Sequence, residues 1–340
     1  MFTFLPYHAD ELYRRFLQIV SLPSHFAFLS NYHDIRVAST LPPVPRQLFI
    51  RALSKNSVFL EAYFASIVSR VKSGHGYPAM IVKWTSLAVE AILQMRQARV
   101  NEETIVSRVM PFIAEGLQIK QSSDFQIANY TVLTVLASNR TLTDTVIDAA
   151  MEAICQGWTD QSRRLGILCL VTLAQNRESQ ELSDTVVQSL LLIKYYLCCS
   201  FANLRDFVAV VESFPPKVAV SQLLVPIANR LLVSPKMPEV DHVFLTRITF
   251  SKRLSSHDRH VIIQSAISCL FNSKKLKPII GKWLASCAEE HAEDFKVSIA
   301  PLISTLDTGK IEELENYTQL SLKVKCIVVM LTFRIKAMTK

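Results

Sequence analysis

The sequence predicts an all-α protein, an α-solenoid built from HEAT-like helical hairpins. Two repeated motifs carry this prediction. LTDTV at 142–146 returns 40 residues later as LSDTV at 182–186, and LTVLASNR at 133–140 returns 37 residues later as LVTLAQNR at 170–177. A helical period near 40 residues is typical of HEAT and armadillo arrays. Only seven glycines occur in 340 residues, and few segments alternate polar and apolar residues as strands do.

Helix signals follow one another along the whole chain. Pro45 suits the first turn of a helix, SGHG at 73–76 marks a turn, and the proline-containing stretch 23–45 is the least regular. We predict helices over residues 9–21, 44–55, 57–72, 78–98, 102–119, 124–138, 143–157, 162–175, 183–197, 203–213, 217–233, 239–253, 257–272, 277–289, 292–306 and 318–338. Together they form one predicted solenoid over 1–340, less regular over 1–56 and stacked in helix pairs over 57–340.

One predicted hairpin shows both helix types of the repeat. Thr143 or Asp144 can cap its first helix, and apolar residues then recur every three or four positions as far as Gly157. The second helix, 163–175, is apolar nearly all round and must be buried on several sides. A half-exposed helix beside a sandwiched one is what stacked hairpins produce. The segment 105–139 has the same pattern.

Composition bounds the class of protein. The chain has 37 basic and 29 acidic residues, for a net charge of +8, and half of its residues are hydrophobic. No apolar run reaches the roughly 18 residues that a membrane helix needs. The first residues lack a basic segment before the apolar ones, so we expect no secretory signal. The seven cysteines fall mostly on apolar helix faces, which suits reduced, buried thiols in an intracellular compartment.

Motifs of catalysis and cofactor binding do not occur. The glycines form neither GxGxxG nor GxxxxGK, and the sequence has no CxxC pair and no GxSxG elbow. His257 and His260 lie three residues apart, but a metal or acid–base role would need a further ligand or partner. The alternative is a solvated helix start capped by Ser255 or Ser256. We therefore expect no catalytic residue, no metal and no cofactor.

Basic residues are the candidate binding positions. Between 236 and 282 nine basic residues face three acidic ones. Such clusters bind nucleic-acid phosphates or simply solubilise a surface. Arg163 and Arg164 could face a groove, or pair with Asp160. The candidates for RNA or partner binding are Arg163, Arg164, Lys252, Arg253, Lys274, Lys275, Lys277 and Lys282, and aligned turns of successive repeats could bring the last six to one side.

Several short segments resemble one family. FLPYH at 4–8 comes a few residues before an amphipathic helix. Further segments follow in order: Phe28-Leu29 with Tyr32, Pro42-Pro43, Pro111 with Glu115-Gly116-Leu117, Gly157-Trp158-Thr159-Asp160, and Leu173-Ala174-Gln175. Together they resemble the N-terminal HEAT region of the U3 small nucleolar RNA-associated protein 10 family, densely from about residue 4 to 195. Ala9-Asp10 departs from the residues usual in the family after His8.

The resemblance implies a role as well as a fold. Family members are much longer, so the chain would be an excised N-terminal piece. They are nucleolar scaffolds of the small-subunit processome, in the UtpA subcomplex with β-propeller and helical subunits. The resemblance implies contacts with these subunits, and with U3 snoRNP and the pre-rRNA leader, during 18S rRNA maturation and linked rDNA transcription. It implies no enzymatic activity, membrane contact or small-molecule substrate.

Two alternatives stay open at the level of sequence. A HEAT-repeat transport adaptor of the karyopherin type would bind protein cargo. It would need an acidic groove for basic cargo, and the net charge of +8 argues against that. An enzyme hidden in a helical fold would need a convergent polar site, and the sequence shows none.

Overall fold

The computed structural model describes residues 1–33, 43–139, 142–179, 182–187, 189–190, 202–233 and 239–303. Throughout these ranges the secondary structure is helical, with no strand, which confirms the all-α prediction. Most of the predicted helix 183–197, the end of 292–306 and all of 318–338 lie outside the described residues. The chain divides into two compact units: unit 1 is Met1–Ser179 with Gln188–Ile193, and unit 2 is Gln180–Val187 with Lys194–Lys340.

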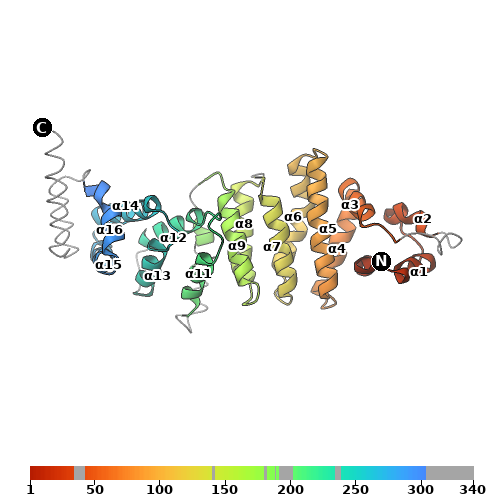
Figure 1. Cartoon of the computed structure of the whole chain (residues 1–340), viewed down its shortest axis with the longest axis horizontal. Coiled ribbons are helices and arrows are strands. Elements are labelled where there is room, and N and C mark those ends of the chain that lie inside the picture. The colour runs from red at the N-terminus through yellow and green to blue at the C-terminus, as the bar shows by residue number, and fades with distance from the viewer. Residues whose placement is uncertain are drawn as a thin grey trace. The chain divides into compact units, whose positions relative to one another are not determined.

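Unit 1 begins with short helices and continues as stacked hairpins (Figure 1). Its elements are the 3₁₀ helices η1 (Phe2–Tyr7) and η2 (Ser24–Leu29) and the α-helices α1 (Glu11–Ile19), α2 (Ser30–His33), α3 (Arg46–Lys55), α4 (Ser57–Lys72), α5 (Pro78–Gln97), α6 (Glu102–Leu117), α7 (Ser123–Ala137), α8 (Asp144–Gly157) and α9 (Arg163–Gln175). The 3₁₀ helices were not predicted. Aromatic packing of Phe2 on Phe26 and of Phe26 on Phe59, with ring centroids 4.9 and 5.2 Å apart, holds them against α4.

The helices of unit 1 form two layers. The helices α3, α5, α7 and α9 each contact the next helix but one, and we call this row the odd layer. The helices α4, α6 and α8 do the same and form the even layer. Figure 1 shows α5, α7 and α9 side by side. Because each hairpin reverses the chain, helices within a layer run parallel, and successive turns lie at opposite ends of the helices.

Unit 2 repeats this arrangement. Its helices are α11 (Ala202–Glu212), α12 (Ser221–Val233), α13 (Glu239–Thr249), α14 (Ser256–Asn272), α15 (Lys277–Glu290) and α16 (Ala292–Ile303). One layer contains α12, α14 and α16, and the other contains α11, α13 and α15. Both units are therefore helical-hairpin stacks of the solenoid class.

The sequence repeats coincide with equivalent places in this stack. Leu133 and Leu136 of α7 correspond to Leu170 and Leu173 of α9, and all four are fully buried. LTDTV and LSDTV each provide a buried leucine, Leu142 and Leu182, followed by the start of a helix. Bonds between neighbouring hairpins span a similar distance in sequence. The Cys169 thiol contacts the Tyr130 carbonyl across 39 residues, for example, and the Trp283 indole donates to Thr246 Oγ1 across 37.

The acidic residue of the repeated motif pairs forward along the chain. Thr143 is the N-cap of α8 but makes no capping bond with its side chain. Asp144 instead accepts hydrogen bonds from the backbone N–H groups of Glu178 and Ser179, both at 3.0 Å. In the second copy Asp184 pairs with Arg230 at 3.1 Å. The motif thus ties the start of one helix to a later element, which local capping rules do not predict.

A buried polar joint connects α7, α8 and α9. Gln126 is fully buried, and its Nε2 donates to the Gly157 carbonyl at 2.6 Å, while its Oε1 accepts from Ser162 Oγ at 2.8 Å. A Cβ on Gly157 would lie 2.5 Å from the Leu117 carbonyl oxygen. Glycine is therefore required where α8 meets the end of α6, and this explains one residue of the GWTD segment.

Two predicted boundaries in unit 2 were wrong. The helix predicted from 217 begins at Ser221, and the helix predicted to end at 253 ends at Thr249. One side chain links the two segments. Arg253 donates to the carbonyls of Phe214, of Pro215 at 3.0 Å and of Val218 at 2.8 Å. Residues 213–220 and 250–255 are turns and irregular backbone in the structure, and the Arg253 side chain joins the two segments.

Candidate partner-binding surface

The two layers of unit 1 differ in the charge of their helices. The even-layer helices α6 and α8 carry four and three charged residues, spread along their length. In the odd layer, α7 has only Asp124, and α9 has only Arg163 and Arg164, all in the first turn. A solvent-facing helix surface normally carries charged residues. Beyond these first turns most residues of α7 and α9 are buried, and the few side chains that reach the surface are uncharged.

An apolar groove lies between α5 and α7 on the odd layer. It has a volume of about 630 Å³. Val82 and Val89 of α5 and Ile127 of α7 are among its lining residues. Val82 is 67% exposed, which is high for a valine in the middle of a long helix. Together with Leu93 further along α5, which is 44% exposed, these residues make an apolar surface that no described element covers.

The hydroxyl groups of the groove are already bonded. Thr85 donates to the Ile81 carbonyl at 2.8 Å, and Thr131 donates to the Ile127 carbonyl at 3.0 Å. Ser86 donates to Lys83 in the same way. Each hydroxyl proton is therefore used within its own helix. Both walls are helices whose backbone groups bond internally, so the groove offers mainly apolar contact.

Acidic residues lie at both ends of the groove. Asp124, in the first turn of α7, is exposed, and among the described residues its carboxylate has no bonding partner. Glu90 at the other end pairs with Arg46 of α3. Nearby Lys83 is half-buried, and burial first and then the Arg46 charge lower its pKa to about 8. The groove region therefore retains an unpaired acid, whereas burial disfavours the charged form of its neighbouring lysine.

The first predicted basic pair lies at the edge of the odd layer. Arg163 is half-buried and pairs with Asp160, as the second interpretation of the sequence expected. Arg164 is exposed at the start of α9. Seven residues of α9 are buried, as predicted for a sandwiched helix, but Leu165 is 41% exposed. The uncharged surface thus extends from α7 onto α9.

The structure separates the other six basic candidates. Lys252 and Arg253 lie in the turn before α14, whereas Lys274 and Lys275 lie in the turn after it. Because α14 has 17 residues, these turns are about 25 Å apart. Lys277 begins α15, and Lys282 lies more than one helical turn further. The group around Lys274 remains together, and Lys252 with Arg253 belongs to the opposite edge.

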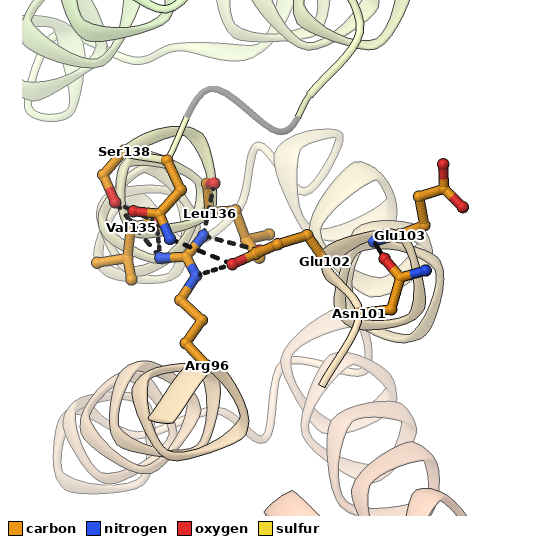
Figure 2. Close-up of polar contacts among 8 residues, drawn as sticks. Arg96, Asn101, Glu102, Glu103, Val135, Leu136 and Ser138 are labelled. Atoms are coloured by element: carbon orange, nitrogen blue, oxygen red, sulfur yellow. Dashed lines mark hydrogen bonds and ion pairs between the residues drawn. The ribbon is translucent and has the colours of Figure 1, made fainter. Parts of the chain in front are cut away.

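Arginines also join neighbouring repeats through carbonyl groups. Figure 2 shows the Arg96 guanidinium between the end of α7 and the start of α6. It donates to the carbonyls of Val135 at 2.8 Å and Leu136 at 2.9 Å, and pairs with Glu102 at 2.8 Å. Arg253 makes the equivalent contact in unit 2. Sequence reasoning missed this role because an arginine near a helix end gives no sign of what it reaches.

One histidine of the predicted pair has a structural partner. Ser255 caps α14 and forms a capping box with Asp258, which confirms the predicted helix start. His260 Nδ1 lies 2.8 Å from the Ser298 carbonyl oxygen on α16. Across the described ranges, no group of three or more His, Cys, Asp or Glu side chains could hold a metal ion.

The cysteines of unit 1 lie in the core. Cys155 and Cys169 are buried, and burial raises the pKa of both thiols, that of Cys169 to about 12. A protonated, buried thiol is a poor nucleophile. In the part of the chain that the structure describes, no helix combines the length and the apolar character needed to cross a membrane.

Sequence reasoning missed the groove, although a signal was present. Val82 and Val89 lie seven residues apart and therefore share one face of α5. Ile127 lines the same groove from α7. The sequence predicted burial on several sides for the apolar helix 163–175, but made no prediction for the outer faces of α5 and α7. The missing information was which flank of the odd layer a further helix covers.

Fold and surface together define a helical-repeat protein with an apolar groove between two helices of one layer. The sequence profile of U3 small nucleolar RNA-associated protein 10 matches residues 105–231. Proteins of that name from Aspergillus oryzae and Aspergillus terreus are 28% and 30% identical over 203 residues, each match covering 56% of this chain and 11% of the relative. The protein of that name from Neosartorya fischeri is 26% identical over 344 residues, covering 92% of this chain and 19% of the relative.

These matches confirm the predicted resemblance to the U3 small nucleolar RNA-associated protein 10 family. The matched regions span about a tenth to a fifth of the length of these relatives.

Proposed function

We propose that the chain is a non-enzymatic scaffold in U3 snoRNP function and small-subunit ribosome biogenesis. The names of its relatives support a U3 small nucleolar RNA association. The observation in the structure that supports a scaffold is the apolar groove that lies open between α5 and α7 on the odd layer. Stacked helical repeats supply extended binding surfaces of this kind.

The finer assignment follows the resemblance. We propose that the chain acts in the nucleolus within the UtpA subcomplex, contacts its β-propeller and helical subunits, and supports pre-18S rRNA processing and linked rDNA transcription. We also propose that residues 1–340 belong to a single repeat array. The recurrence of LTDTV as LSDTV supports this, because one copy belongs to each unit.

Direct RNA contact is a separate part of the proposal. Lys274 and Lys275 are exposed in one turn, and Lys277 follows at the start of α15. Such a turn can bind RNA phosphates without reading sequence. We expect replacement of all three by glutamate to weaken single-stranded RNA binding and reduce the salt slope by about two. Unchanged affinity and slope in binding at two salt concentrations would remove this turn from any RNA path.

Co-purification tests the scaffold role. The tagged chain should recover U3 snoRNA and small-subunit processome proteins from nucleolar extract, and recovery should survive ribonuclease if protein surfaces carry the contact. The matched control is the chain with Leu170→Ala and Leu173→Ala, which should lose recovery together with its fold. No enrichment of U3 snoRNA over a control RNA would contradict the proposal.

The transport-adaptor alternative predicts a different outcome. Such an adaptor would recover basic cargo proteins and no U3 snoRNA. The one unpaired acid at the groove, Asp124, is the observation that keeps it open. Recovery of cargo without the RNA would favour it.

A further inference from the structure

We propose that the groove between α5 and α7 is the docking site for an amphipathic α-helix of a partner protein, with a basic residue of that helix reaching Asp124. This inference deepens the proposed scaffold role and rests on it. It names the face, the kind of element bound and the charge that orients it.

The character of the walls selects a helix over an extended peptide. An extended segment would bring backbone N–H and C=O groups into contact with Val82, Val89 and Ile127. The protons of Thr85 and Thr131 are already donated within their own helices. Unpaired backbone groups in an apolar groove cost free energy. A helix avoids this cost because it bonds its own backbone.

The dimensions of the groove suit about three turns of helix. Its α5 wall runs from Pro78 to Glu90, which is about 18 Å along the helix axis. Anchor side chains at positions i, i+3 or i+4, and i+7 span about 10 Å. The open groove of about 630 Å³ therefore has room for several aliphatic anchors in one row.

Charge gives the partner its polarity. Asp124 is exposed at one end of the groove, and its carboxylate has no bond to any described residue. Glu90 at the other end is already paired with Arg46. A Lys or Arg placed beyond the apolar anchors would find a free carboxylate at the Asp124 end alone. An acidic residue in its place would be repelled, which sets the direction of the bound helix.

The test uses synthetic helical peptides and the complete chain. One peptide carries leucines at i, i+4 and i+7 with lysine one turn beyond; a second has glutamate in place of lysine; a third has the leucines scattered around the helix. The lysine peptide is made in two forms, one with the lysine N-terminal to the leucines and one with the lysine C-terminal to them. Fluorescence anisotropy should show about tenfold tighter binding of the lysine peptide than of the scattered one. Equal binding of both would overturn the proposal.

Two variants with matched exposure locate the site. Val82 is 67% exposed on α5, and Val58 is 63% exposed on α4 in the even layer. Val82→Glu should weaken peptide binding about tenfold or more, because it places a charge against the apolar anchors. Val58→Glu should leave binding within about twofold. Equal effects of the two substitutions would overturn the proposal, and thermal unfolding by circular dichroism checks that both variants fold.

The charge swap needs no apolar substitution. Asp124→Lys should reverse the preference, so that the glutamate peptide binds more tightly than the lysine peptide. An unchanged preference would overturn the assigned orientation. A dimer in sedimentation velocity that Val82→Glu abolishes would assign the groove to a second copy, and RNA binding that Val82→Glu abolishes would assign it to RNA; either result overturns the proposal.

Failure here and failure of the scaffold role are distinguishable. If the chain recovers U3 snoRNA but no peptide binds, the scaffold role stands and the groove is not its contact. If peptides bind as described but no U3 snoRNA is recovered, the groove is a helix site of a protein with another role.

Discussion

The even and odd layers of unit 1 have similar cores and different outer surfaces. Val68 of α4 and Leu133 of α7 are equally buried, yet charges occur along the whole of α6, whereas α7 has one charged residue in its first turn. Folding requires only that the inner faces be apolar. Most of α7 and α9 is buried, so the fold explains why they carry few charges; the proposed partner would cover the apolar side chains that stay exposed between α5 and α7.

The largest expected effect lies in the shared core. Leu170→Ala and Leu173→Ala should each lower the free energy of unfolding by about 2–5 kcal/mol, because both side chains are fully buried in α9. The matched control, Ala149→Ser on the exposed face of α8, should change it by less than about 0.5 kcal/mol. Denaturant unfolding measures both. Losses below about half a kcal/mol at both leucines would mean that α9 is not internal.

The close contact between Gly157 of α8 and the end of α6 leaves no room for an added carbon. Gly157→Ala should destabilise the protein by about 1–3 kcal/mol, because its Cβ would lie 2.5 Å from the Leu117 carbonyl oxygen. Gln156→Ala, one residue earlier and exposed, serves as the control. Equal stability of the two variants in urea unfolding would show that α6 and α8 can separate at no cost.

The arginine contact should matter more than an ordinary surface arginine. Arg96→Met should cost about 1.5–3 kcal/mol, because it removes the charged donor that the Val135 and Leu136 carbonyls and the Glu102 carboxylate share. Arg108→Met on α6 is the control, since the described residues show no bond to its guanidinium. Equal melting temperatures for the two variants would contradict the structural role of Arg96.

Gly74 and Arg99 each follow a helix and share a left-handed backbone conformation. Substitutions at these two positions should change stability by a smaller amount. Gly74 after α4 has φ 76°, and Arg99 after α5 has φ 57°. Side chains disfavour this left-handed region. Arg99→Gly should therefore stabilise the protein by about 0.5–1 kcal/mol, and Gly74→Ala should destabilise it by about 1 kcal/mol. Thermal unfolding of the two variants measures both stability changes. Changes of the same sign in the two variants would contradict the prediction.

The smallest effect concerns the odd-layer lysine. The pKa of Lys83 is lowered to about 8 in the folded protein, so the unfolded state binds more protons above that pH. Its contribution to stability therefore rises between about pH 8 and 10. Lys83→Met should stabilise the protein at pH 7 and lack this rise, so its advantage over the parent should shrink between about pH 8 and 10. A difference that does not change with pH would mean that Lys83 is not desolvated.

The fold was largely predictable because its signals are local. Helix 57–72 was predicted with both bounds correct, since a capping residue and a turn at SGHG delimit it. The bound at Ser221 was not: the turn before it bonds to Arg253, which lies 32 residues from Ser221 in sequence, and local signals do not reveal such a contact. The basic residues could be found from composition. Composition does not show that Lys252 and Arg253 lie before α14 whereas Lys274 and Lys275 lie after it. The groove depends on which flank stays uncovered, and periodicity does not encode that.

The central claim is that the odd layer, and not the even layer, carries the partner contact. Hydroxyl-radical footprinting of the chain, free and within purified U3 particles, measures this side chain by side chain. The account predicts that labelling of Val82, Leu93 and Ile127 falls at least about threefold on assembly, as for groups buried in an interface core. Labelling of Val58 should stay the same. Protection of Val58 with unchanged labelling of Val82 and Ile127 would contradict the claim.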